Sequence, residues 1–285
     1  ISSLKARFQI DLLIVSDGLL PKFIAEKQLT PVQKAASLWE KATSGDRDAL
    51  QYEIFASYPN AYRAEVLSAA RVTRTDILVA PYATAPQLVY FYLRQIVNCC
   101  AGSVMCLLYN VQEAGEEDDS DSLCNADPMT QVITGFDLKA GTFDWVDKDD
   151  MMAVIEQEAG KPIGEDILAQ LFAAMGGLYG VTLVAETLDS RRNLFTKSLE
   201  KGGRPQLEEV ESHQEILLLN LIFDIAPVLN DACKLDCLTR TSGNRQLYGG
   251  SSTFKSVMGL CYNNEVYFQL AKGLLNPEVL EILCN

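Results

Sequence analysis

The sequence has little of what most enzymes use for catalysis. Among its 285 residues there is one histidine, His213, and a single imidazole excludes every metal site that needs two histidine ligands. The motifs HExxH, GxxxxGK(S/T), GxSxG, GxGxxG and CxxC are absent, so the common metalloprotease, phosphate-loop, serine-hydrolase, dinucleotide-binding and thiol-redox signatures are missing. We therefore expect a protein that is not an enzyme and that holds no metal ion or cofactor.

Long hydrophobic runs are also scarce. Two stretches without charged residues, 95–112 and 167–185, approach the length of a bilayer span. The first contains Asn98 and Asn110, the second contains three glycines, and the mean hydropathy of +0.04 is typical of a soluble protein. We expect both stretches to form buried core helices, with no membrane segment.

The eight cysteines form no regular framework. Several lie in apolar runs, where a reduced cysteine packs as a small hydrophobic residue. Cys99 and Cys100 are neighbours that cannot easily pair, and the spacing of Cys233 and Cys237 suits one helix face better than a zinc knuckle. We therefore expect unpaired thiols and a reducing compartment.

Acidic residues outnumber basic residues, and the excess of negative charge is concentrated in one segment of the sequence. The net charge is −14, but residues 113–166 carry 16 Asp and Glu against three Lys, which accounts for −13 of it. The densest part, 116–122, has no apolar residue, so we expect an exposed acidic loop. It lacks the spacing of a calcium-binding EF-hand loop.

Basic residues gather in three other places. Arg71 and Arg74 share one face of a predicted helix, as do Lys197 and Lys201, so each pair could present two cations to a strand of phosphates. The polar, glycine-rich loop 239–250 could let the backbone approach an anion. An ordinary solvated surface explains each group equally well. The candidate nucleic-acid ligands are Arg71, Arg74, Arg191, Arg192, Lys197, Lys201, Arg204, Arg240, Arg245, Lys255 and the ring of Tyr262.

Helical spacing of apolar residues dominates the chain, and it predicts an all-α, mainly helical protein with one small β-hairpin. Residues 2–75 are expected to be entirely helical, and the hairpin is expected at 132–138 and 142–146. The predicted helices cover residues 31–43, 47–58, 61–74, 87–111, 150–160, 186–200, 207–236 with a bend at Pro227, 252–261 and 264–274.

The charge pattern divides the predicted helices into two lobes. We expect an N-terminal helical lobe at 1–112, an acidic loop and hairpin connector at 113–149, and a C-terminal helical lobe at 150–285. A groove between these lobes would be lined by the basic groups from both sides.

Two segments resemble the nucleoproteins of non-segmented negative-strand RNA viruses. Residues 167–172 (ILAQLF), followed by Gly177, Val181 and Leu183, are similar to a glycine-rich helix pattern of pneumovirus nucleoproteins. About 85 residues downstream, 252–259 (STFKSVMG) and 264–271 (NEVYFQLA) resemble a pattern shared by pneumovirus and paramyxovirus nucleoproteins, with Ala271 in place of the usual glycine. The resemblance covers about 100 residues.

The resemblance implies a bilobed protein that polymerises along genomic single-stranded RNA and grips it, without reading its sequence, in the cleft between lobes. The implied partners are the RNA, further copies of the chain and a viral phosphoprotein-like protein, and the implied location is the virion nucleocapsid and the host cytoplasm or nucleus. On this basis Arg191 and Arg192 are the foremost phosphate ligands. Lys255 follows for phosphate, and Tyr262 for stacking or sugar packing.

Other functions fit parts of the sequence. The first alternative is a cytoplasmic all-helical adaptor or scaffold whose acidic segment docks a basic partner. The second is an all-α enzyme with a Mg²⁺-diphosphate site, built from Asp118, Asp119 and Asp121 or from Asp147, Asp149 and Asp150. The weakest alternative is an enzyme that uses a nucleophilic pair of His213 with one of the cysteines.

Reversing the charge of Arg191 and Arg192 by substitution with Glu should abolish retention of RNA, because affinity for a phosphate backbone depends on its neutralisation. Retention is measured from the 260 to 280 nm absorbance ratio of the purified protein, and circular dichroism should show unchanged helix content. RNA retained by the doubly substituted protein would contradict the assignment.

Overall fold

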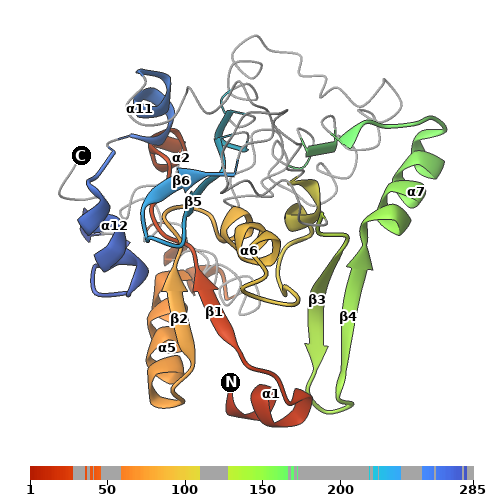
Figure 1. The fold of residues 1–285 in the computed structure, drawn as a ribbon, viewed down its shortest axis with the longest axis horizontal. Coiled ribbons are helices and arrows are strands. Elements are labelled where there is room, and N and C mark those ends of the chain that lie inside the picture. Colours follow the sequence, from red (N-terminus) through yellow and green to blue (C-terminus); the bar gives the residue numbers. More distant parts are fainter. Residues whose placement is uncertain are drawn as a thin grey trace.

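A computed structural model describes residues 1–27, 36, 39–40, 42–45, 59–109, 128–165, 168–169, 172, 218, 221–223, 225–238, 252–259, 261–277 and 279–280 (Figure 1). Of the described residues, 48% are helical and 17% lie in strands. The protein is therefore mixed α/β, and the prediction of an all-α protein is wrong. Both lobes expected to be helical contain strands. The acidic loop 116–122 and the helices predicted at 47–58 and 186–200 lie outside the described residues.

The N-terminal part contains a parallel pair of strands. Strand β1 (Leu13–Ser16) pairs in register with β2 (Asp76–Val79), so residues 2–75 are not entirely helical. A parallel pair needs a crossover connection, and the connecting segment includes α2 (Lys22–Lys27) and α5 (Pro59–Val72), of which α5 packs against β2. Four-residue strands are too short for an alternating pattern to stand out from helical spacing.

A tight turn follows the carboxyl end of β1. The N–H of Gly18 donates to the carbonyl oxygen of Tyr82 at 2.7 Å, and a Cβ atom at this position would overlap the carbonyl oxygen of Ala80. Only glycine fits so close an approach. Next to it, Asp17 accepts hydrogen bonds from the backbone N–H (2.7 Å) and the hydroxyl (2.6 Å) of Thr84. The end of β1 therefore satisfies a donor that the first turn of a helix leaves unpaired.

That helix, α6 (Thr84–Leu93), lies at the centre of the molecule, and seven of its ten residues are buried. The prediction of one helix over 87–111 is wrong, because α6 ends at Leu93 and Gln95 takes a left-handed φ of 56°. The chain resumes as a short 3-10 helix, η1 (Val104–Leu108), with Ser103 as its cap. The connection between α6 and η1 is largely exposed, but its apolar residues Ile96 and Val97 continue the hydrophobic pattern of α6, which concealed the break.

A second hairpin replaces the last part of the helix predicted over 207–236, whereas the described residues 218, 221–223 and 225 are helical and 207–217 lie outside the described residues. Strand β5 (Pro227–Leu229) is fully buried and pairs antiparallel with β6 (Leu235–Cys237). In the turn, the Asn230 side-chain oxygen accepts the N–H groups of Ala232 and Lys234, as turn-forming Asn residues do. Pro227 therefore begins a strand and does not bend a helix.

The hairpin predicted around residue 140 is confirmed. Strands β3 (Gln131–Asp137) and β4 (Thr142–Asp147) pair antiparallel, and α7 (Lys148–Ala159) follows directly. Asp147 caps α7 by accepting from the N–H groups of its first turn, and Gly160 ends the helix with a left-handed φ of 66°. In Figure 1 these elements form one side of the molecule.

The helices predicted at 252–261 and 264–274 are also confirmed, as α11 (Ser252–Met258) and α12 (Asn264–Ala271). They lie with α2 and α5 on the side of the molecule opposite α7 (Figure 1). The short α1 (Ser2–Phe8) begins the chain. Within the ranges given above, no helix combines the length and the apolarity that crossing a bilayer requires.

Two adjoining hydrophobic clusters form the core. One is built mainly from α6 and η1, and the other joins residues of α2, α11 and α12. Strand β5 belongs to both, because Val228 packs in the first cluster and Leu229 in the second. The position of β5 therefore decides how the two clusters meet.

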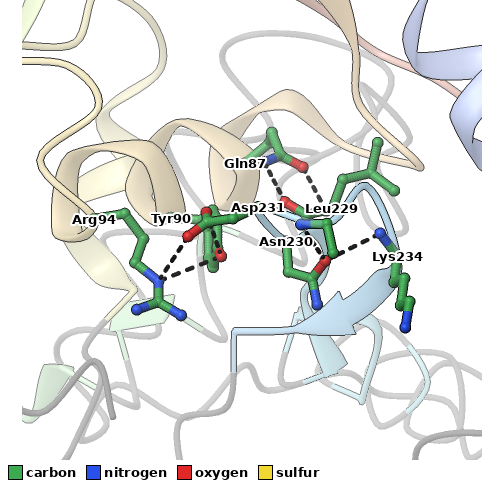
Figure 2. A network of polar contacts seen from close by, with 8 residues as sticks. Gln87, Tyr90, Arg94, Leu229, Asn230, Asp231 and Lys234 are labelled. Atoms are coloured by element: carbon green, nitrogen blue, oxygen red, sulfur yellow. Dashed lines mark hydrogen bonds and ion pairs between the residues drawn. The ribbon is translucent and has the colours of Figure 1, made fainter. Parts of the chain in front are cut away.

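A buried side chain of α6 holds β5 in place. The Gln87 amide is fully buried, and it donates to the carbonyl oxygen of Leu229 at 3.0 Å and accepts from the N–H of the same residue at 2.7 Å (Figure 2). A buried backbone group needs such a partner, because leaving it unpaired costs free energy. The Gln87 amide thus makes the two hydrogen bonds to β5 that the backbone of a neighbouring strand would make.

Replacing Gln87 with Met keeps the side-chain volume but leaves both Leu229 groups unpaired. We expect the free energy of unfolding to fall by about 2–6 kcal/mol, since each of the two buried unsatisfied groups costs about 1–3 kcal/mol. Chemical denaturation of the full chain measures the loss. The control is Gln157→Met at an exposed position of α7, which should change stability by less than about 0.5 kcal/mol; equal effects of the two substitutions would contradict the role of Gln87.

Candidate functional site

The described residues include four of the eleven predicted nucleic-acid ligands: Arg71, Arg74, Lys255 and Tyr262. All four belong to the side of the molecule formed by α5, α11 and α12 (Figure 1). The other seven lie outside the described residues, namely Arg191, Arg192, Lys197, Lys201, Arg204, Arg240 and Arg245.

Arg71 joins two segments that are distant in the sequence. It lies in the last turn of α5, and its Nη2 atom donates to the carbonyl oxygen of Gly273 at 3.0 Å, just beyond the end of α12. A cation at a helix C-terminus is stabilised by the partial negative charge there. Arg71 therefore fixes the end of α12 against α5.

Two more cations belong to the same neighbourhood. Arg74 is exposed in the turn that leads from α5 into β2, with a left-handed φ of 51°. Lys272 is exposed at the end of α12, and its Nζ atom lies 3.9 Å from the ring centroid of Phe268, within the range of a cation–π contact. The sequence analysis missed Lys272, although it immediately follows the second resembling segment.

Lys255 and Tyr262 lie on other parts of this side. Lys255 is exposed on α11, and the residue that ends this helix, Gly259, packs against Lys22 of α2. The Tyr262 ring is partly buried and stands edge-on to Tyr267, with 6.1 Å between centroids. Because Tyr262 also packs against the second core cluster, only part of its ring faces solvent.

Charge is divided between the two sides of the molecule. The elements α2, α5, α11 and α12, with the turns that adjoin them and the start of β2, have more cations than anions, although the two signs are interspersed. Among the residues whose side chains are described, they carry Lys22, Arg71, Arg74, Lys255 and Lys272 against Glu65, Asp76 and Glu265.

The opposite side, β3 to the segment after α7, has the reverse balance (Figure 1). It carries Asp137, Asp144, Asp147, Asp149, Asp150, Glu156, Glu158 and Glu165 against Lys139, Lys148 and Lys161. Lys148 is buried and paired with Glu165 at 2.8 Å. The acidic residues of this side therefore disfavour the approach of a polyanion.

A polar network near the β5–β6 turn consists of a tyrosine, an aspartate and an arginine. Such side chains also occur in active sites, but here their hydrogen bonds connect the turn to α6. The Tyr90 hydroxyl donates to Asp231 at 3.0 Å and accepts from Nε of Arg94 at 3.3 Å (Figure 2). Burial is the main cause that raises the pKa of Tyr90, so the hydroxyl stays protonated at neutral pH. The network ties the β5–β6 turn to α6.

The groups proposed for catalysis have other roles where they are described. Asp147 accepts hydrogen bonds from the Gln131 side chain and from the N–H groups of Asp149 and Asp150, and these bonds lower its pKa. This trio therefore forms a helix cap, and no group of three or more His, Cys, Asp or Glu in the described part of the chain could hold a metal ion. His213, Asp118, Asp119 and Asp121 lie outside that part.

The buried thiols are unsuited to nucleophilic chemistry. Burial raises the pKa of Cys100 and of Cys106 to about 12, and only the thiolate form is a nucleophile. Neither thiol is therefore ionised at neutral pH. Both pack in the first core cluster, as expected of a reduced cysteine in an apolar run.

Comparison with known proteins gives no relative for this chain: no family model matches it, and no curated protein matches it. The resemblance to viral nucleoproteins therefore depends on the two short segments alone. A functional assignment depends on the charges and contacts described above.

Replacing Arg71 with Met should lower the free energy of unfolding by about 0.5–1 kcal/mol, since a cation at a helix C-terminus contributes about that much. The control is Lys234→Met, which removes one positive charge from the exposed β5–β6 turn, outside any helix, and should leave stability unchanged. Thermal unfolding at low ionic strength measures both. If the two variants unfold at the same temperature, Arg71 does not hold the end of α12.

Proposed function

We propose that this chain binds single-stranded RNA through its phosphates, without reading the base sequence, in the manner of a viral nucleoprotein. The observation that carries the proposal is the division of charge between the two sides of the molecule. The RNA lies on the cationic side, formed by α5, α11 and α12.

Two of the cations suit phosphate binding on physical grounds. Arg74 and Lys272 are exposed, and the link between Arg71 and Gly273 joins the two segments that carry them. Each cation that neutralises a phosphate releases condensed counterions from the RNA, which supplies affinity independent of sequence. A protein that coats a genome needs this kind of affinity, because it must accept every sequence.

The wider proposal follows the resemblance. The chain polymerises along the RNA with further copies of itself, works with a phosphoprotein-like partner, and belongs to a virion nucleocapsid and the host cytoplasm or nucleus. The mixed α/β fold gives this part no support, because the resemblance implies a helical protein. The support is the order of the two resembling segments, the second of which forms α11 and α12.

Binding of labelled single-stranded RNAs should weaken steeply as salt is added, and equally for unrelated sequences. In the double variant Arg74→Asn, Lys272→Gln, the slope of log affinity against log salt should fall by about 1.4, at roughly 0.7 for each lost phosphate contact. Asparagine is chosen at position 74 because it tolerates a left-handed backbone. Fluorescence polarisation measures the affinities.

The matched control is Lys139→Gln, which also removes a positive charge but lies in the turn of the β3–β4 hairpin on the acidic side. Its slope should equal that of the unaltered protein. The proposal fails if Lys139→Gln changes the slope as much per charge as the double variant does, if no RNA binds, or if one sequence is strongly preferred.

A further inference from the structure

We propose that the outer edge of strand β4 is a docking site for an extended, lysine- or arginine-rich peptide segment of a partner protein, which adds to the hairpin as a third strand. The proposal is independent of RNA binding, because it concerns the opposite side of the molecule. It depends on the aromatic face, the hydrogen-bonding edge and the charge of the β3–β4 hairpin.

Large aromatic side chains are left exposed on this hairpin. Phe143 is 49% exposed and Trp145 is 51% exposed. They are two residues apart on β4, so their side chains point to the same face. Exposed aromatic residues close together on a sheet are characteristic of interaction surfaces.

The face is held firmly by contacts from other elements. Phe8 of α1 stands edge-on to Phe136 at 5.4 Å and to Phe143 at 6.4 Å between centroids. The Arg7 guanidinium donates to the carbonyl oxygen of Lys139 in the hairpin turn at 2.7 Å. A partner would therefore bind an ordered surface, and little conformational entropy would be lost on binding.

The edge that can accept a strand is that of β4. On the other edge, Ile133 of β3 already uses its N–H and its carbonyl oxygen, which bond to Cys100 and Gly102. Trp145 is the residue opposite Ile133, so the two form a non-hydrogen-bonded pair, and the N–H and carbonyl of Trp145 point away from β3. Among the described residues, β4 pairs with β3 alone.

Charge decides which peptide fits. Asp144 directly precedes Trp145 and points to the other face of β4. Asp147 follows Trp145 by two residues, and Asp149 and Asp150 lie at the start of α7. Like-charged or neutral strands are disfavoured at an edge that carries charged side chains. A cationic strand gains from the same carboxylates and from cation–π contact with Trp145, while its backbone extends the ladder.

The two tryptophans of the chain allow a direct test. The other one, Trp39, is 73% exposed. In the full chain carrying Trp39→Phe, the emission of Trp145 should change when a short peptide of alternating lysine and valine is added. In Trp145→Phe the peptide should leave the emission of Trp39 unchanged.

Binding affinity gives the second measurement, with a labelled peptide followed by polarisation. Trp145→Ala and Asp144→Lys should each weaken binding at least about tenfold, whereas Trp39→Ala should leave it unchanged. A peptide with glutamate in place of each lysine should not bind. The Asp144→Lys variant keeps the ring of Trp145, and the Trp145→Ala variant keeps the carboxylate of Asp144. Weaker peptide binding in both variants, with unchanged circular dichroism, therefore supports the site.

Several results would overturn the proposal. These are absence of binding by the lysine peptide, equal binding by Trp145→Ala, or equal binding of the glutamate peptide. Dimerisation that Trp145→Ala abolishes would make a second copy of the chain the occupant. Quenching of Trp145 by single-stranded RNA would make the hairpin a nucleic-acid surface.

Discussion

The arrangement of the core depends on one buried amide. Gln87 pairs with both backbone groups of Leu229, a residue 142 positions away, and so fixes β5 against α6. Since β5 contributes to both hydrophobic clusters, this contact sets how the clusters meet. The same helix receives Asp17 at its first residue and holds the β5–β6 turn through Tyr90 (Figure 2). The central helix thus positions elements from two other parts of the chain.

The two proposed binding surfaces are compatible because they differ in charge and lie apart. A polyanion is attracted to the side of α5 and α12 and repelled from the β3–β4 hairpin, whereas a cationic peptide experiences the reverse. Neither ligand therefore competes with the other for the same residues. A protein of this kind could hold RNA and a basic partner at once, which also preserves the adaptor hypothesis as part of the same picture.

Local signals explain which elements could be predicted. The β3–β4 hairpin, α7, α11 and α12 have turn or capping residues beside them, such as Gly141, Asp147 and Asn263, and their positions were predicted correctly. The pairing of β1 with β2 depends on contacts between distant segments, which a single sequence does not reveal. The strand β5 depends on Gln87 in the same way, so the chain around Pro227 resembled a bent helix.

The candidate site was predictable only in part, for a similar reason. The placement of Arg71 near the end of a helix followed from helical spacing. The prediction that Arg74 shares a face of that helix is wrong, because α5 ends at Val72 and Arg74 takes a left-handed φ of 51°. The contact of Arg71 with Gly273 and the neighbouring Lys272 could not be predicted, because they require knowing that α12 ends beside α5. The exposure of Trp145 could not be predicted either. Alternating residues in a strand define two faces of the sheet, but they do not show which face other elements cover.

The parallel pairing of β1 with β2 also bears on synthesis of the chain by the ribosome. Leu13 pairs with Asp76, so at roughly 5–20 residues per second the first strand emerges several seconds before its neighbour does. During that interval its N–H and carbonyl groups are open to any other extended segment nearby. Copies translated side by side on one messenger could therefore exchange this strand, and a chaperone that covers the first twenty or so residues would prevent it.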